Sequence, residues 1–276
     1  MPDRQIQLLT AAIIGLFLIS GSATAAQRWY HVELMVFSNN NASTTEQWDA
    51  TPPLAYPERF RFLLDSSQLN TAGTRPTPFV KLPRRGSAFY NKAAYMDRVG
   101  GYRILFHENW VQPVREEANA LPLVLDRSGD TGKWPLLQGS VKLYLSRYLH
   151  LETNLWLNTR GDYLPGTWQM PAPPLGPASI VIEEPEPIGP QPQESMPQSG
   201  AAMDGTDPGS ENLVAGFEQE TAKPVYPYRH AILLKQHRRM RSKEVHYIDH
   251  PILGLVIKIS PLTEEDLETM ALQEKM

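Results

Sequence analysis

Residues 141–157, VKLYLSRYLHLETNLWL, alternate between apolar and polar side chains almost without interruption. A period of two is typical of a β-strand, because successive side chains of a strand point to opposite faces of the sheet. The odd positions, mostly leucine, form a core face. The even positions are Lys142, Tyr144, Ser146, Tyr148, His150, Glu152, Asn154 and Trp156. The run is long for one strand, so we expect a bend or a turn near Arg147–Glu152.

Other segments show the same alternation or are rich in β-branched and aromatic residues, and they are predicted as strands. They are residues 28–37, 102–107, 228–240, 243–248 and 252–260. In the first of them, RWYHVELMVF, one face carries Tyr30, Val32, Leu34 and Val36. The chain is therefore expected to build most of its core from strands.

Two helices are predicted from their end signals. Residues 86–101 form a short helix, with Ser87 as its N-cap and Gly100 and Gly101 as its stop. Thr263 caps a final helix, and the acidic residues that follow it suit the positive end of the helix dipole.

Residues 171–222 interrupt this pattern, since they hold ten prolines, six glycines and nine acidic residues with no Lys or Arg. Such a composition cannot bury enough apolar surface to offset the entropy of ordering, so disorder is predicted. Only 54 residues follow this segment, too few for a comfortable independent core. Residues 223–276 are therefore expected to complete the domain begun by residues 26–170. The predicted fold is α+β, mainly an antiparallel sheet with a few helices, interrupted by a long disordered Pro-rich acidic insertion.

The N-terminus has the features of a secretory signal peptide. Arg4 is followed by an apolar run over residues 6–19, and Ala23-Thr24-Ala25 fits the small-x-small cleavage rule. Residues 1–25 are thus predicted to be removed by cleavage near residue 25 or 26, which leaves no membrane span. An uncleaved anchor is the alternative. The chain has no cysteine, which excludes disulfides and thiol catalysis, and a periplasmic location fits both features.

Charge is distributed unevenly along the chain. Residues 27–170 and 223–260 together hold 24 Lys and Arg against 15 Asp and Glu, a net charge of +9, whereas residues 171–222 and the C-terminal tail are acidic. A basic body in an exported protein favours anionic partners such as cell-wall polymer, and nucleic acid is not expected in that compartment. The alternative is that the acidic segments simply offset the body.

The segment RRMRSKEVHYIDHPILG, residues 238–254, carries the most chemistry. His246 and His250 have the spacing of metal ligands on a helix, but on a strand positions four apart lie about 13 Å from each other. Structural histidines are therefore predicted, and no metal or other cofactor. No nucleophile elbow or phosphate-binding glycine loop occurs, and pairs such as His107-Glu108 and His150-x-Glu152 are common by chance. The sequence thus predicts no catalytic residues.

Candidate ligand-binding residues come from two places. Arg239 and Arg241 lie in what we predict to be a polar hairpin, where two guanidinium groups two positions apart suit a carboxylate ligand. The even face of residues 141–157 adds rings that could stack on sugars and a further polar side chain. These candidates are Tyr144, Tyr148, His150 and Trp156. The alternatives are a solvated arginine cluster and a face covered by a helix.

Four pieces, in this order, resemble the CsiV family of periplasmic peptidoglycan-binding proteins of proteobacteria. They are RWYHVELMVF after the signal peptide, YRILFHENWVQP (102–113), GSVKLYLSRYLHLETNL (139–155) and RRMRSKEVHYIDHPILGLVIKI (238–259). The resemblance implies wall binding and support of peptidoglycan synthesis. It assigns no binding or catalytic residue.

We therefore expect a non-catalytic periplasmic peptidoglycan-binding accessory protein that supports cell-wall synthesis. One alternative is a protein-interaction factor that contacts a wall synthase or its lipoprotein activator. An unrecognised hydrolase is the other.

Overall fold

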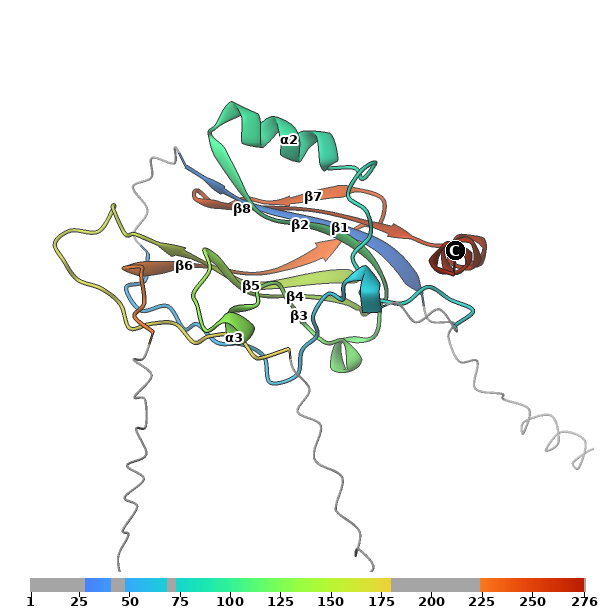
Figure 1. Cartoon of the computed structure of the whole chain (residues 1–276), viewed down its shortest axis with the longest axis horizontal. Coiled ribbons are helices and arrows are strands. Elements are labelled where there is room, and N and C mark those ends of the chain that lie inside the picture. Colours follow the sequence, from blue (N-terminus) through green and yellow to red (C-terminus); the bar gives the residue numbers. More distant parts are fainter. Residues whose placement is uncertain (1–27, 41–47, 69–72, 180–223, 276) are drawn as a thin grey trace, which may run out of the picture.

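The computed structural model describes residues 28–40, 48–68, 73–179 and 224–275 (Figure 1). The predicted signal peptide and most of the predicted insertion lie outside these residues. The strands of the described part are β1 (Trp29–Asn39), β2 (Tyr102–Pro113), β3 (Leu123–Val124), β4 (Leu137–Leu145), β5 (Leu149–Thr159), β6 (His230–Met240), β7 (Val245–Ile248) and β8 (Leu253–Pro261). The helices are α2 (Tyr90–Val99), α3 (Ser128–Thr131) and α4 (Glu264–Glu274), with short 3-10 turns at Ser66–Gln68 and Glu117–Asn119.

The strands form two four-stranded sheets that lie face to face (Figure 1). The first sheet has the order β2-β1-β8-β7 and the second the order β3-β4-β5-β6, and all neighbouring strands are antiparallel. The predicted antiparallel α+β fold is confirmed. The C-terminal strands complete both sheets, since β6 pairs with β5 while β8 pairs with β1. The sequence had indicated one sheet. One sheet and two could not be distinguished, because the pairing of distant strands leaves no local signal in the sequence.

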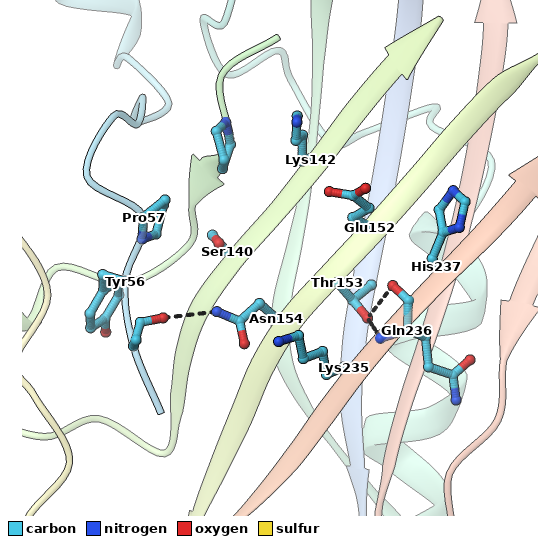
Figure 2. Close-up of a pocket in the computed structure, with 12 residues that line it drawn as sticks. Tyr56, Pro57, Ser140, Lys142, Glu152, Thr153, Asn154, Lys235, Gln236 and His237 are labelled. Atoms are coloured by element: carbon cyan, nitrogen blue, oxygen red, sulfur yellow. Dashed lines mark hydrogen bonds between the residues drawn. The ribbon is translucent and has the colours of Figure 1, made fainter. Parts of the chain in front are cut away.

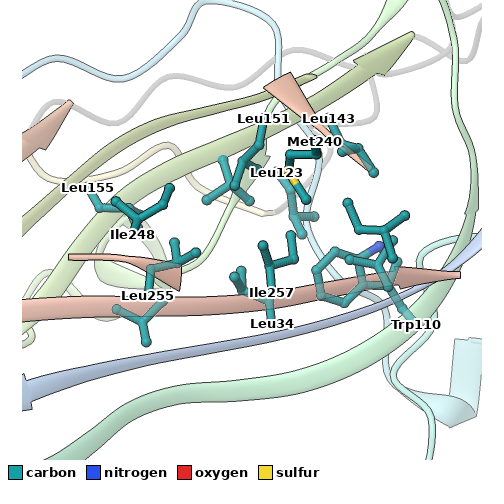
Figure 3. Packing of buried hydrophobic residues seen from close by; sticks show 14 of the residues in the cluster. Leu34, Trp110, Leu123, Leu143, Leu151, Leu155, Met240, Ile248, Leu255 and Ile257 are labelled. Atoms are coloured by element: carbon teal, nitrogen blue, oxygen red, sulfur yellow. The ribbon is translucent and has the colours of Figure 1, made fainter. Parts of the chain in front are cut away.

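The main core lies between the two sheets (Figure 3). Tyr30, Val32, Leu34 and Val36 of β1 all belong to it, which confirms the face predicted for that strand. The opposite sheet contributes the odd-numbered leucines of β4 and β5. Burial of such side chains contributes roughly 1.5–3 kcal/mol each, so this interface is the main source of stability.

The long alternating run folds as a hairpin rather than one strand. β4 ends at Leu145, β5 begins at Leu149, and these two residues pair across a three-residue connection in which the Ser146 N–H donates to the Tyr148 carbonyl at 2.9 Å. The predicted turn near Arg147–Glu152 is thus confirmed at the start of that range. In this pairing, odd-numbered residues of β4 lie opposite odd-numbered residues of β5. The odd-numbered side chains of both strands therefore point to one face of the sheet, and the even-numbered side chains point to the other.

Helix α2 covers the outer face of the first sheet (Figure 1), where Phe89 and Ala93 pack against Met35 and Phe37. The prediction of Ser87 as its N-cap is wrong, because the N-cap is Phe89 and no local side chain caps the helix. The carboxylate of Glu33 instead accepts the N–H groups of Ala88 and Phe89, the two residues before the helix. Gly100 ends the helix in the left-handed region, at φ 77°.

Helix α4 begins as predicted. Thr263 and Asp266 form a capping box, in which the Thr263 hydroxyl accepts the Asp266 N–H at 3.2 Å and the Asp266 carboxylate accepts the Thr263 N–H at 2.8 Å. Leu267 of this helix packs with Trp29 and Val111 at the end of the first sheet. No helix in the described part of the chain is long and apolar enough to span a membrane.

Residues 171–179 correct the predicted boundary of the insertion. They have no regular structure, but they are bound to the second sheet and to α3. Trp134 Nε1 donates to the Pro173 carbonyl at 2.8 Å, the Gly176 N–H donates to Ser128 Oγ at 2.7 Å, and the Ser179 N–H donates to Asp130 at 2.6 Å. The domain therefore extends to residue 179, and residues 180–222 of the predicted disordered segment lie outside the described residues.

Candidate binding face

The outer face of the second sheet carries a grid of nine side chains, and no helix among the described residues covers it (Figure 1). We call it the open face. It consists of three rows across β4, β5 and β6, which are Ser140–Asn154–Lys235, Lys142–Glu152–His237 and Tyr144–His150–Arg239. Strands about 4.8 Å apart and a rise of about 3.3 Å per residue give the grid dimensions of roughly 10 by 13 Å. Figure 2 shows the first two rows.

A groove of about 640 Å³ lies over the first two rows (Figure 2). Its wall is the segment Ala55–Pro57 together with Pro122. Hydrogen bonds hold this wall: Asn154 Nδ2 donates to the Ala55 carbonyl at 2.8 Å, the Tyr56 hydroxyl donates to Asp126 at 2.7 Å, and Gln138 Nε2 donates to the Tyr56 hydroxyl at 3.0 Å. Burial raises the pKa of Tyr56, and the neighbouring Asp126 charge adds to the effect, so the hydroxyl stays protonated. The groove thus has a fixed shape.

Past the Ser140–Asn154–Lys235 row, towards Trp156, the same face of the sheet is covered by loops. Trp156 is fully buried beneath Tyr56, Met170 and Tyr226, and its indole nitrogen donates to Gln138 Oε1 at 3.2 Å. The interpretation of Trp156 as a ligand-stacking ring is therefore wrong. Alternation assigned it to the correct face, but covering loops from distant parts of the chain decide its burial.

Tyr144 is also unavailable for stacking, because only 4% of it is exposed. Its ring stacks on those of His150 and His237, with centroids 5.0 and 6.2 Å away. The expectation that Tyr144 presents a ring to a sugar is wrong too. Tyr148 differs from both, since it is 46% exposed at the tip of the hairpin, with the guanidinium of Arg239 lying 4.2 Å above its ring.

Two histidines of the open face contact each other directly. His150 Nδ1 lies 2.9 Å from His237 Nε2, which is also 3.1 Å from the Tyr144 hydroxyl. For this contact to be a hydrogen bond, one imidazole nitrogen donates its N–H and the other accepts it. In the described residues no group of three or more His, Cys, Asp or Glu is arranged to hold a metal ion.

Four charged groups of the open face are available to a ligand. Lys142, Glu152, Lys235 and Arg239 form no ion pair with any residue that the structure describes. Lys142 Nζ lies 5.2 Å from the Tyr144 ring centroid, and Arg239 stacks on Tyr148. Two of these cations, Lys142 and Lys235, line the groove together with Glu152, which gives the groove a net positive charge; Arg239 lies beyond it in the third row.

The segment 238–254 is not the predicted polar hairpin. β6 and β7 belong to different sheets, so the chain crosses from one sheet to the other between Met240 and Val245. Arg239 lies on the open face, whereas Arg241 lies past the strand end in this crossover, exposed and 3.8 Å from Glu244. The two arginines therefore do not share a strand face, which the hairpin interpretation required.

The other two histidines of that segment have structural partners, as predicted. His246 Nε2 lies 2.9 Å from the Arg241 carbonyl and 3.1 Å from its N–H, so it fixes the crossover turn. His250 Nδ1 accepts the N–H groups of Ile252 and Leu253 at 3.3 and 3.2 Å, at the β7–β8 turn.

Comparison with known protein families shows to which family the chain belongs. The family model CsiV, described as a peptidoglycan-binding protein, matches residues 6–262. The chain belongs to the CsiV family. Comparison with curated proteins and with solved structures gives no match. The resemblance seen in four pieces of the sequence is thus confirmed over most of the chain.

Several residues of the open face in this CsiV-family chain were missed from the sequence. Lys142, Glu152 and Asn154 could have been found, because they share the parity of Tyr144 and His150. Lys235 and His237 could not, since they join the face only through the pairing of β5 with β6, whose partners are about 80 residues apart in sequence.

Proposed function

We propose that this protein is a non-catalytic periplasmic peptidoglycan-binding accessory of cell-wall synthesis, and that the open face is its binding surface. Membership of a family described as peptidoglycan-binding supports the binding function. The observation that supports the surface is a set of three cations that form no ion pair with the described residues: Lys142 and Lys235 line the groove, and Arg239 lies in the next row of the open face.

The physical reason is charge complementarity with a polymer rich in carboxylates. Charge-assisted bonds from lysine and arginine to carboxylates are about twice as strong as neutral ones. A wall polymer repeats its unit many times, so modest affinity per site suffices for retention on a sacculus. Binding of this kind weakens as salt screens the charges.

Co-sedimentation of purified protein with isolated sacculi across a salt series tests this proposal. The double variant Lys142→Gln plus Lys235→Gln should reduce the bound fraction at low salt and flatten the salt dependence. A matched control changes two exposed cations of α2 on the other sheet, Lys92→Gln plus Arg98→Gln, and should bind like the wild type. Equal loss in both double variants would show that only net charge matters and would remove the open face from the proposal.

The same experiment distinguishes binding from hydrolysis. Incubated sacculi should release no soluble muropeptides above the background of buffer alone. Release that depends on the protein would contradict the non-catalytic proposal and favour a hydrolase.

Export is part of the proposed function, because the wall lies outside the inner membrane. The sequence features of residues 1–25 support cleavage near residue 25 or 26. The intact mass of the periplasmic protein should correspond to a chain that begins at Ala26 or Gln27. A mass that includes Met1 would contradict cleavage and support the anchor alternative.

Exposed apolar side chains on the first sheet favour a second candidate function, contact with a wall synthase or its lipoprotein activator. Tyr102 and Tyr247 flank Phe37, with ring centroids 5.5 and 6.4 Å from it, and both are about half exposed. Tyr95 and Val99 of α2 are 60% and 56% exposed. A pull-down from periplasmic extract with the Tyr95→Ala plus Tyr247→Ala variant tests this, since sacculus binding should persist while capture of the synthase or activator is lost.

A further inference from the structure

The open face offers charged groups rather than aromatic platforms, and this bears on which part of peptidoglycan it holds. We infer that it binds the peptide stem, as a zwitterion, and not the glycan strand. This inference rests on the proposed function and specifies its ligand.

Sugar-binding sites often place an exposed aromatic ring against one face of a sugar, because such rings are rigid and amphipathic. Of the rings that the sequence places on this face, Trp156 and Tyr144 are buried. Tyr148 is exposed, but Arg239 occupies one side of its ring. Two aromatic rings line the groove and both are already packed: Tyr56 lies edge-on to Trp156, with centroids 5.0 Å apart, and His237 stacks on His150 at 5.0 Å. The other lining side chains are charged, polar or small, so the groove favours a charged ligand over a glycan strand.

The charges of the groove match a ligand that carries both signs. Lys142 and Glu152 are directly opposite each other on β4 and β5. Lys235 lies on β6 opposite Asn154, diagonally from Glu152. Neither lysine forms an ion pair with Glu152 in the described residues. The Tyr144 hydroxyl is a hydrogen-bond neighbour of Glu152, but a carboxylate has further acceptor sites for a ligand. The peptide stem of peptidoglycan carries carboxylates and, where it contains a diamino acid, a free ammonium group. Its carboxylates would bind Lys142 and Lys235, and its ammonium would bind Glu152.

The size of the open face agrees with a short peptide. A tetrapeptide stem, fully extended, spans about 13 Å, the length of the grid along the strands. The apolar wall of Ala55, Pro57 and Pro122 suits the methyl groups of alanine residues, which make up much of the stem. Asn154 lines the groove beside this wall; its Nδ2 donates to the Ala55 carbonyl, and its Oδ1 can accept an amide N–H of the stem.

Three probes test the inference: intact sacculi, glycan strands from which an amidase has removed the stems, and free stem tetrapeptide. Sacculi and tetrapeptide should bind, and denuded glycan should bind at least tenfold more weakly than sacculi. Glu152→Gln should weaken tetrapeptide binding by about tenfold, because the ammonium loses its charged partner. The control Glu265→Gln, on an exposed position of α4, should leave it unchanged. Melting temperatures confirm that each variant is folded.

The outcomes separate this inference from the proposed function. If denuded glycan binds as well as sacculi, the protein is a wall binder but the stem is not its ligand. If Glu152→Gln strengthens binding of tetrapeptide, the ligand is purely anionic and the zwitterion inference is wrong. If none of the three probes binds, the proposed function itself fails.

Discussion

At the scale of single residues, Glu33 is the buried carboxylate that positions the outer helix. It is 1% exposed, its two oxygens accept the N–H groups of Ala88 and Phe89 at 2.7 Å, and His107 Nε2 lies 3.1 Å away. Burial alone would raise the pKa of Glu33, but the bonds from His107 and the two backbone N–H groups outweigh it and lower the pKa to about 2. The carboxylate thus fixes the two residues before α2 and lies near the positive end of that helix.

Glu33→Gln should lower the free energy of unfolding at pH 7 by on the order of 2 kcal/mol, because the charged acceptor is lost. Since the pKa of Glu33 is lower in the folded state, its contribution is present above the ordinary value of 4.5 and disappears as the pH falls towards 2. Urea unfolding at pH 7 and pH 3 measures this. The difference in free energy of unfolding between wild type and variant should be smaller at pH 3 than at pH 7. A difference that does not change with pH would show that the loss of stability is steric.

Arg239 and Arg241 are neighbours in sequence with different surroundings, so they should behave differently. Arg239→Ala removes a cation of the open face and its stack on Tyr148, and should weaken sacculus binding at low salt. Arg241→Ala removes an exposed side chain with one long contact to Glu244, and should change neither binding nor melting temperature. Co-sedimentation of the two single variants with sacculi at low salt measures this difference. Equal loss from both would mean that the crossover turn binds the wall as well.

At the scale of elements, α4 shows a cap that local sequence predicts. Thr263→Ala should lower the free energy of unfolding by about 1 kcal/mol, because the Asp266 N–H and the capping box lose their partner. Thr269→Ala is a matched control, since it removes the same side chain from an exposed mid-helix position where alanine is a better helix former. Thermal unfolding of both variants checks this. A loss in Thr269→Ala as large as in Thr263→Ala would assign the effect to the helix surface and not to the cap.

The two helices show which parts of the fold the sequence can predict. Thr263 lies three residues from its partner, so the pattern of the chain reveals it. Glu33 holds the two residues before α2 from a strand more than 50 residues earlier, and no local rule connects the two. The strands behave in the same way. Periodicity identifies them and their faces, but strand pairing decides that β6 and β7 lie in different sheets, and covering loops decide that Trp156 is buried while His150 is not.

At the scale of the whole molecule, the acidic segment is inserted between two parts that complete each other. Residues 171–179 are bound to α3 and to Trp134, and Tyr226 donates to Asn158 Oδ1 at 2.8 Å on the other side of the insertion. The chain is thus fixed to the second sheet before residue 180 and after residue 223. Because β6, β7 and β8 lie beyond the insertion, a protein truncated at residue 179 would lack two strands of the first sheet and one strand of the second.

Removal of residues 180–215 should shift the melting temperature by no more than a few degrees, and upward. The composition of that segment predicts that it forms no hydrophobic core. Halving the length of a flexible loop lowers the free-energy cost of closing it by only about 0.6 kcal/mol. Extending the deletion back to residue 173 should instead lower the melting temperature, because it removes the bonds that Trp134, Ser128 and Asp130 make to residues 173–179. Calorimetry on the two deletions measures the difference between them. If the shorter deletion costs as much stability as the longer one, the acidic segment packs against the domain and its composition is a poor guide to its behaviour.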